Sequence, residues 1–321
     1  MKATLIYNHD AGPLDSTGPD QLQEALQKAG YQPVYEATSS VDDLDAILED
    51  ITGLVVSAGG DGTAKAIAIR LLGNQSAAIT ILPMGTANNL VRTLQIEGTP
   101  LEIIERLREP VKRQIDVGKV SAPWGMDYFI EGAGLGFFAQ VLATYEPENG
   151  KSITRSVQAL VEVLREGYGQ TTTIKVNGEE ISTEFLLVEI LNTHSVGPRL
   201  KFAPDADPTD GLLNVVCIDG QKREGYFQYL RSMLQEQMDE LPSVSVYKAS
   251  ELEIEWKGFP FHVDDYVRPL GFDFRPQDQS FPLRQYPYSS QDNTIRVNVL
   301  PQALNLWLPQ DPEGKGNDHE D

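Results

Sequence analysis

The feature that most constrains this chain is the glycine-rich segment Gly59-Gly60-Asp61-Gly62-Thr63, which follows a short apolar run at residues 53–57. A helical apolar pattern over residues 64–71 comes next, so the sequence predicts a buried strand, a loop and a helix in that order. Glycines let the backbone approach a phosphate closely, and a helix N-terminus offers free N–H groups and positive potential. The Asp61 carboxylate would repel phosphate, so it indicates a metal, a metal-bound water or a sugar hydroxyl in the same loop. The alternative is an ordinary glycine-rich turn in which Asp61 caps the helix.

A second loop of this kind, Gly85-Thr86-Ala87-Asn88-Asn89, follows the apolar run at residues 79–82. Its hydroxyl and amides suit the sugar and phosphates of a nucleotide, although Asn and Gly also fill ordinary turns. Ligands of parallel α/β sheets bind at the carboxyl ends of the strands, so both loops are expected to meet in one cleft. The chain contains no Gly-x-x-x-x-Gly-Lys-Ser/Thr motif, which excludes a P-loop.

Strand and helix patterns alternate over the first hundred residues, which predicts a parallel sheet with helices on both sides. The expected strands are residues 4–7, 31–35, 53–57 and 79–82, and the expected helices are residues 21–29, 41–49 and 64–71. From about residue 114 short β-rich runs dominate, and Asn177-Gly178 is typical of a hairpin turn. Two helices are expected among these strands, near residues 153–165 and 224–238.

These patterns predict two domains. An α/β domain covers residues 1–113, and a mainly antiparallel, β-rich domain covers residues 114–309. The last stretch of the second domain, residues 300–308, is expected to pack back on the body. Residues 268–293 form a Pro/Gln/Ser-rich excursion, and residues 310–321 are expected to be a disordered acidic tail.

The composition of the chain excludes several classes of function. The 321 residues carry 47 acidic and 26 basic side chains, which gives a formal net charge of -21. This charge argues against nucleic-acid binding, which needs a basic face. An anionic lipid surface would also repel the chain, unless a local basic patch outweighs the negative net charge. The single cysteine, Cys217, excludes an intrachain disulfide and a cysteine-built zinc site. No apolar stretch approaches the ~20 residues of a membrane-spanning helix, so we expect a cytoplasmic protein.

The order of these motifs resembles the catalytic domains of diacylglycerol kinases. That superfamily includes bacterial diacylglycerol kinases, related bacterial lipid kinases, sphingosine kinases and ceramide kinases. The likeness spans nearly the whole chain. The segments that carry it are Asn8 with Gly12 and residues 59–63, 83–89, 114–118, 132–137, 203–206, 210–213 and 297–308.

The resemblance implies an NAD-kinase-like or phosphofructokinase-like parallel sheet, ATP and Mg²⁺ as cofactors, and a lipid hydroxyl as the phosphate acceptor. Asp61 and Asp116 would belong to a network of carboxylates, water and Mg²⁺. Asp210 would either form a turn with Gly211 or hold a structural Mg²⁺ with nearby oxygens. The residues implied around ATP are Asn8, Thr38, Gly59, Gly60, Asp61, Gly62, Thr63, Gly85, Thr86, Asn88 and Asn89.

The resemblance also places a catalytic base in a late Asp-Gly-Glu motif. Asp264 matches the Asp of that motif, whereas Asp265 and Tyr266 replace the Gly and the Glu. Strand alternation points neighbouring side chains to opposite faces, so only one of the two acids is expected to face the acceptor, and we expect Asp264. Three further departures are Asn89 in place of an acid, Ala66 in place of a Glu and Glu131 in place of an Asn.

Two other functions stay open. One is a nucleotide-binding or lipid-binding homologue with weak or lost activity, because the departures remove carboxylates. The other is a soluble-substrate kinase related to NAD kinases, which share the glycine-rich segment but also carry an Asn-Glu motif that is absent from this chain. A lipid kinase of this kind would contact the membrane transiently, would bind no nucleic acid and could form a homodimer.

Further residues have a structural and a functional interpretation. His262 is expected to pack against its sheet rather than act in catalysis, and Arg199 to lie on the surface rather than bind phosphate. A basic cluster is either a solvated helix end or a contact with membrane headgroups, and an aromatic set is either packing or a lipid-docking face. The cluster comprises Arg106, Arg108, Lys112 and Arg113, and the aromatic set comprises Tyr226, Phe227 and Tyr229.

Overall fold

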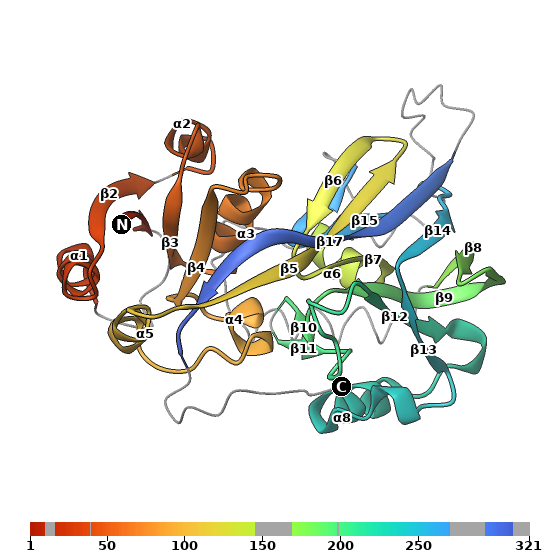
Figure 1. The fold of residues 1–321 in the computed structure, drawn as a ribbon. Helices are drawn as coiled ribbons and strands as arrows, with labels where there is room; N and C mark the ends of the chain where they lie inside the picture. The colour runs from red at the N-terminus through yellow and green to blue at the C-terminus, as the bar shows by residue number, and fades with distance from the viewer. Residues whose placement is uncertain (10–16, 39, 145–168, 198, 270–292, 311–321) are drawn as a thin grey trace. The chain divides into compact units, whose positions relative to one another are not determined.

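The computed structural model describes residues 1–9, 17–38, 40–144, 169–197, 199–269 and 293–310. The chain divides into two compact units, Met1–Ile115 together with the chain from Gln302, and Asp116–Pro301. Two strands, β5 (Val111–Ala122) and β17 (Thr294–Leu308), carry the chain from one unit to the other (Figure 1). The C-terminal return therefore belongs to the first unit, whereas the sequence grouped it with the second domain. The reason is its pairing, because Leu306 lies parallel to Ile79 in the first unit's sheet.

The sheet of the first unit is parallel, as its sequence pattern predicts. Its strands lie in the order β4 (Ala77–Pro83), β3 (Gly53–Gly59), β1 (Lys2–Asn8) and β2 (Gln32–Thr38). All three pairings between these strands are parallel. The near-continuous apolar runs of β3 and β4 are typical of parallel strands that are buried on both faces.

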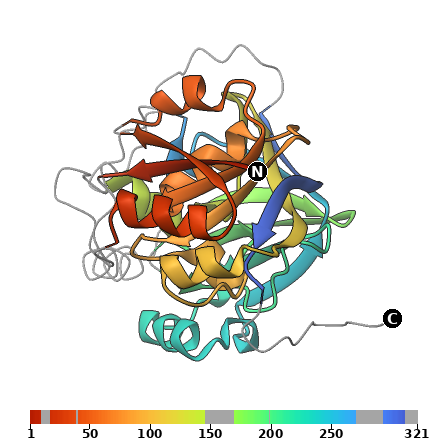
Figure 2. The same cartoon turned by 60° about the vertical axis from the view of Figure 1, so that its left-hand side comes forward.

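Helices cover both faces of this sheet. On one face α1 (Pro19–Lys28) contacts α5 (Pro100–Arg106), and on the other α2 (Asp43–Leu48) contacts α3 (Asp61–Arg70) (Figures 1 and 2). A short helix, α4 (Asn89–Thr93), follows β4. The start of α5 is fixed by a capping box, in which the Glu102 N–H donates to Thr99 Oγ1 and the Thr99 N–H donates to the Glu102 carboxylate.

The second unit is built from antiparallel strands, which confirms the predicted β-rich domain. Among its described residues α6 (Phe137–Thr144) and α8 (Tyr226–Gln235) are the α-helices. The predicted helix at residues 153–165 lies outside the described residues, as do most of the 268–293 excursion and the acidic tail. The strands are β6 (Gly125–Phe129), β7 (Gly132–Gly136), β8 (Gln170–Val176), β9 (Glu179–Leu191), β10 (Ser195–Val196), β11 (Leu200–Lys201), β12 (Leu213–Asp219), β13 (Val244–Ala249), β14 (Glu251–Glu255), β15 (Phe261–Val263) and β16 (Tyr266–Arg268).

The long strand β9 organises this unit. It pairs with β7, β8 and β12, and its hairpin with β8 turns at Asn177 and Gly178, both of which have positive φ, as the Asn-Gly pair predicts. Its side chains alternate between two cores. Val188 and Ile190 enter one apolar cluster, whereas Leu187 and Leu191 enter the other, against α6 and α8. No helix in the described part of either unit is long and apolar enough to cross a membrane.

Candidate functional site

The first predicted loop lies at the carboxyl ends of β1 and β3. The side-chain amide of Asn8, the last residue of β1, donates to Thr63 Oγ1 at 2.9 Å. Thr63 lies in the first turn of α3, so this bond joins the end of one strand to the helix that follows its neighbour. Thr38 lies beside Asn8 in the register of β1 with β2, and its side chain is buried. The structure therefore gathers Asn8, Thr38 and Thr63 at one edge of the sheet.

Glycines allow the two predicted loops to touch. A Cβ on Gly85 would lie 2.5 Å from the Cα of Gly60, and a Cβ on Gly59 would lie 2.6 Å from Thr63 Oγ1. Contacts under about 3 Å are not tolerated between such atoms, so a side chain at Gly85 would push the two loops apart and one at Gly59 would displace the Thr63 side chain. Gly85 thus serves the close approach of the two backbones.

Asp61 joins the loops a second time. Its Oδ2 accepts the backbone N–H of Asn88 at 2.7 Å, which holds the start of α3 against the turn before α4. Asn88 has a left-handed backbone, with φ 52° and ψ 48°, and its side chain closes its own loop. Its Oδ1 accepts the Gly85 N–H at 3.0 Å, and its Nδ2 donates to the Gly85 carbonyl at 2.9 Å. The Asn88 amide therefore shapes the loop, a role that the sequence did not assign to it.

Gly62 shows the face of the site that is open. A Cβ on this residue would meet nothing within 4 Å, and Gly62 lies exposed in the first turn of α3. The first N–H groups of a helix lack intrahelical acceptors and carry positive potential. An anion such as a phosphate fits this bare surface without displacing any side chain. Thr86 is exposed on the facing loop, whereas Asn89 begins α4 and is buried.

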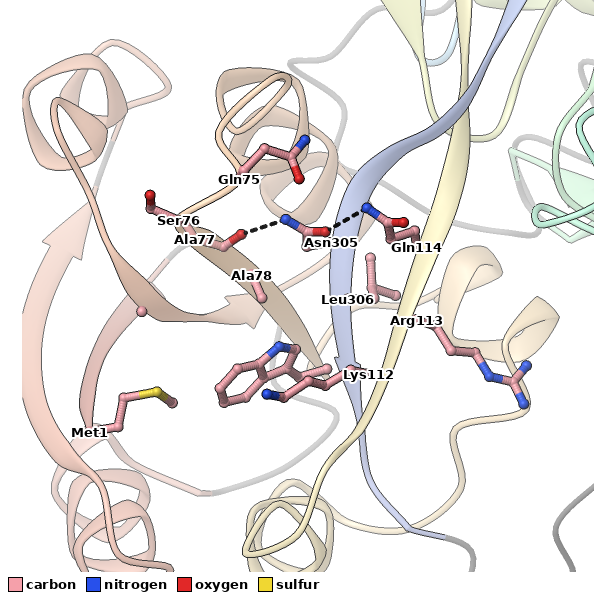
Figure 3. Close-up of a pocket in the computed structure, with 12 residues that line it drawn as sticks. Met1, Gln75, Ser76, Ala77, Ala78, Lys112, Arg113, Gln114, Asn305 and Leu306 are labelled. Atoms are coloured by element: carbon pink, nitrogen blue, oxygen red, sulfur yellow. Dashed lines mark hydrogen bonds between the residues drawn. The ribbon is translucent and has the colours of Figure 1, made fainter.

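A pocket of about 530 Å³ lies at the opposite ends of these strands (Figure 3). Gly53 and Ala77, the first residues of β3 and β4, line it, and none of the predicted ATP residues does. A chain of amides crosses it, because Gln114 Nε2 donates to Asn305 Oδ1 and Asn305 Nδ2 donates to the Ala77 carbonyl. The ammonium of Lys112 lies 4.9 Å from the centre of the Trp307 ring. This pocket is separate from the loops that carry the nucleotide-binding motifs.

In the second unit, Asp264 is held by backbone donors. Its Oδ1 accepts the N–H groups of Glu131 at 2.9 Å and Gly132 at 3.2 Å, and its Oδ2 accepts the N–H of Ile130 at 3.1 Å. These bonds stabilise the charged carboxylate, which is buried. Asp265 is exposed. The structure thus separates the two acids, and it gives Asp264 the positioned carboxylate.

The replacement of the motif's glycine has a simple structural account. The left-handed backbone of the β15–β16 turn falls on Asp264, with φ 48°, and not on Asp265. Aspartate tolerates this conformation better than most residues. Asp265 in the glycine position therefore adds no backbone strain. Tyr266, in the glutamate position, starts β16 and is exposed.

A buried ion pair that the sequence did not identify lies next to Asp264. Glu189 on β9, Gly134 on β7 and His262 on β15 form one row across three paired strands. The Glu189 side chain crosses over Gly134, and its Oε1 lies 2.9 Å from His262 Nε2. A Cβ on Gly134 would lie 3.0 Å from Glu189 Oε2 and 2.2 Å from the Val188 carbonyl oxygen, so the row requires glycine. The second ring nitrogen, Nδ1, lies 3.0 Å from the carbonyl oxygen of Asp264, which can only accept a hydrogen bond.

These contacts fix the proton that the pair shares. Because Nδ1 must donate to the Asp264 carbonyl, one further proton lies between Nε2 and the Glu189 carboxylate. Burial opposes charge on His262, but the Glu189 carboxylate beside it outweighs burial and raises the pKa of the imidazole. Burial likewise raises the pKa of Glu189, and His262 offsets part of that effect. Because both pKa values are raised, the pair keeps its shared proton to a higher pH than the separate groups would.

The other predicted metal ligands also lie in the second unit. Asp116 is fully buried, and its Oδ2 accepts the Gly211 N–H at 2.7 Å. Asp210 forms an ion pair with Lys248 at 3.1 Å, and its Oδ1 accepts the Leu212 N–H. The ammonium already neutralises Asp210, so the turn is its supported role. Within the described residues no three His, Cys, Asp or Glu side chains form a group that could hold a metal ion.

Comparison with known proteins agrees with this architecture. Residues 2–120 match the diacylglycerol kinase catalytic domain, and residues 147–272 match the YegS C-terminal NAD kinase beta sandwich-like domain. Residues 2–120 belong to the diacylglycerol kinase catalytic-domain family. The two matches lie mainly in the first and in the second unit, which confirms the predicted α/β domain followed by an antiparallel β-rich domain.

Bacterial lipid kinases are among the relatives that match the chain. A diacylglycerol kinase of Bacillus subtilis (strain 168) is 28% identical over 246 residues, which are 72% of this chain and 77% of that protein. The "Probable lipid kinase YegS-like" of Pectobacterium atrosepticum is 27% identical over 310 residues, 92% of this chain and 93% of that protein. A crystal structure of a diacylglycerol kinase from Bacillus anthracis str. Sterne superposes with a TM-score of 0.66 at 17% identity, over 97% of each chain. At that identity the likeness establishes the fold alone.

Proposed function

We propose that this protein is an ATP- and Mg²⁺-dependent kinase that transfers the γ-phosphate of ATP to a lipid hydroxyl. The observation that carries the proposal is the double link between the two loops of the first unit. Gly60 lies against Gly85, and Asp61 accepts the Asn88 N–H. The links leave the backbone of the first turn of α3 bare and open, as a phosphate-binding surface requires.

Different residues of the first unit would bind the phosphates, the rest of the nucleotide and the metal ion. The N–H groups at the start of α3 would bind phosphate oxygens, and the exposed Thr86 would contact the nucleotide from the facing loop. Asp61 at the start of α3 would hold Mg²⁺, which when bound neutralises the charge that develops on the transferred group. Phosphoryl transfer requires positioning and charge neutralisation more than covalent assistance, so the missing family carboxylates do not by themselves preclude activity.

Asp264 would receive the proton of the lipid hydroxyl. A positioned carboxylate within hydrogen-bond reach can take that proton as the bond to phosphorus forms. The three backbone donors and the His262 contact support this assignment because they fix both the carboxylate and the carbonyl of Asp264. Asp265 is exposed and is the weaker candidate.

The direct test is transfer of labelled γ-phosphate from ATP to a panel of extracted lipids, with and without Mg²⁺. We expect a labelled lipid that requires Mg²⁺. Asp61→Asn is the informative variant, because its side-chain oxygen can still accept the Asn88 N–H while the charge is gone. It should retain the fold and lose most of the transfer.

Two results would replace the proposal. If the label is transferred to NAD in a parallel reaction and to none of the lipids, the protein is a soluble-substrate kinase. Tight ATP binding without transfer to any acceptor would establish a nucleotide-binding homologue that has lost activity. Transfer that is unchanged in Asp61→Asn would remove Asp61 from the metal network.

A further inference from the structure

The most unusual surface of the second unit lies where η2 (Gly220–Lys222) leads into α8. We call residues 221–228 together with Arg231 the η2–α8 tip. Phe227 in the first turn of α8 is 71% exposed, the largest exposed fraction among the large hydrophobic side chains of the described residues. Tyr226 stacks on it, with ring centres 4.3 Å apart and planes at 30°. The two rings form an apolar surface that the domain does not cover.

The other face of the same helix explains why these rings are not packing residues. Tyr229 and Met233 are buried in the apolar cluster beneath α8, and the Tyr229 hydroxyl lies 3.0 Å from Ser243 Oγ. Phe227 is two positions from Tyr229, which places it on the far side of the helix. The sequence grouped Tyr226, Phe227 and Tyr229 as one set, whereas the structure divides it into a buried anchor, Tyr229, a half-buried ring, Tyr226, and an exposed ring, Phe227.

The charges around the tip are unlike those of the chain as a whole. Lys222, Arg223 and Arg231 lie within ten residues of one another in a protein of net charge -21. The Lys222 side chain is 68% exposed and forms an ion pair with Asp219 Oδ2 at 3.6 Å, and Arg231 Nε donates to Gln235 Oε1 at 2.9 Å. Arg231 lies one turn beyond Phe227 on the same face. The single acid of the segment, Glu224, accepts hydrogen bonds from the N–H and hydroxyl of Ser243.

Three further acids lie at the other end of α8. Glu236, directly after the helix, pairs with Lys201 at 2.8 Å, and Asp239 and Glu240 follow in η3 (Met238–Glu240). The helix therefore has a basic, aromatic start and an acidic end. An anionic surface would attract the start of α8 and repel its end, so the helix would approach such a surface with the η2–α8 tip first.

We propose that the η2–α8 tip is a peripheral docking surface for membranes that contain anionic phospholipids. The Phe227 ring would enter the boundary between headgroups and acyl chains, Tyr226 would lie at headgroup level, and the cations would contact lipid phosphates. One aromatic residue and three cations give weak, reversible binding, which suits an enzyme that must leave the surface after each encounter. The inference rests on the proposed lipid kinase function, because it supplies the means of reaching a lipid acceptor.

The basic cluster of the first unit is the rival surface. Arg106 is already engaged by the carbonyl oxygens of Glu97 and Gln310, and Lys112 by the ring of Trp307. Trp307 itself is half-buried. This cluster thus offers cations without an exposed aromatic ring, which makes it the appropriate control.

The test is sedimentation with vesicles of phosphatidylcholine alone or with a third of phosphatidylglycerol. We expect binding only to the anionic vesicles, and weaker binding as salt rises. Phe227→Ala should reduce that binding about tenfold, because the variant lacks the ring that would enter the membrane. Lys222→Glu should reduce the binding further at low salt. Thermal unfolding should be unchanged in both variants, since both side chains are exposed.

Two matched variants make the result specific. Met126→Ala removes an apolar side chain that is 56% exposed on β6 of the same unit, and Lys112→Glu reverses a charge in the first unit. Both should bind vesicles like the unaltered protein. Loss of binding in Lys112→Glu with normal binding in Phe227→Ala would transfer the docking surface to the basic cluster and overturn the proposal. Equal binding to both vesicle types would overturn it as well.

Activity separates this inference from the function on which it rests. With the lipid acceptor dispersed in detergent micelles, Phe227→Ala should retain the turnover of the unaltered protein. With the same acceptor in anionic vesicles, its turnover should fall in step with binding. Equal turnover of both proteins in vesicles would refute the docking surface alone, whereas no transfer in either medium would refute the lipid kinase function.

Discussion

The two units use polar residues in opposite ways. In the first unit the polar side chain of Asp61 joins the two predicted loops, that of Asn88 closes its own loop, and Gly62, next to Asp61, faces open space. In the second unit the polar residues around Asp264 are buried and bonded to one another. Asp264 accepts three backbone N–H groups, and both nitrogens of His262 have oxygen partners.

This difference separates binding from stability. A bare backbone surface contributes little to folding, so changes at Gly62 should act on the ligand. A buried charged network is costly to disturb, because the partner that remains is left without its hydrogen bond in a region that excludes water. Substitutions in the second network should therefore act first on the free energy of unfolding.

The largest expected effect is that of Glu189→Leu. It removes the carboxylate beside His262 Nε2 in a fully buried position, and breaking a buried pair typically costs ~3–5 kcal/mol. Urea unfolding should show this loss. Glu189→Gln is the matched control, because its amide can donate to Nε2 of a neutral imidazole and should cost far less. Equal losses in the two variants would mean that the row depends on the carboxylate itself, which both variants lack, and that an amide of the same shape cannot replace it.

The same pair predicts a pH dependence. His262 has its pKa raised from an ordinary 6.5, so its stabilising contribution is complete below that pH and is lost as the pH rises through the folded value. The pKa of Glu189 is also raised, from an ordinary 4.5, and its contribution has the same sign. The advantage of the unaltered protein over Glu189→Gln should therefore shrink from pH 6 to pH 9. Parallel stability curves would show that the pair holds no shared proton.

Gly85→Ala is expected to come next. The added Cβ would meet the Cα of Gly60 at 2.5 Å, and backbone cannot yield as a side chain does. We expect a loss of ~1–3 kcal/mol in stability together with loss of ATP binding, because the loops separate. Calorimetric titration of folded protein with ATP measures the second effect. An intact ATP affinity would place the nucleotide away from these loops.

A change in stability of similar size is expected for Asp264→Asn. It turns one acceptor oxygen into a donor that faces backbone N–H groups, at a cost of ~1–3 kcal/mol. Turnover should fall by roughly 10²–10⁴ at a temperature where the variant is folded. Asp265→Asn, at an exposed position, should change neither quantity appreciably. The reverse ranking of the two variants would assign the base to Asp265.

The smallest effect on folding should come from Gly62→Ala. The new methyl group has free space and the backbone needs no positive φ, so the free energy of unfolding should change by less than ~0.5 kcal/mol. ATP affinity should still fall, because the methyl group occupies the surface on which phosphate would lie. Thermal unfolding and calorimetry together make the distinction. Unchanged affinity in a stable Gly62→Ala protein would exclude phosphate from this turn.

Much of the fold could be predicted from local pattern. The alternation of strands and helices identified the parallel sheet, and Asn177-Gly178 identified a hairpin, because each of these signals acts within a few residues. The C-terminal return could not be assigned in this way. Its membership in the first unit depends on pairing between Leu306 and Ile79, which are far apart in the sequence.

The candidate site shows the same limit. The glycine loops could be found in the sequence, but the bond from Asp61 to Asn88 and the contact of Gly60 with Gly85 depend on tertiary geometry. Glu189 was missed altogether, although a lone acid inside the apolar run of residues 186–191 was the available signal. Its partner became apparent only through the register that places Gly134 between Glu189 and His262.

The two strands that pass between the units make the second unit an insertion within the first. A fragment ending at residue 115 would lack the segment from Gln302, and with it the strand that lies beside β4. The apolar strand β4 would then become an open edge, and exposed apolar edges recruit other chains. The nucleotide-binding half should consequently aggregate when expressed up to residue 115. It should become soluble when residues 302–310 are joined back to it through a short linker.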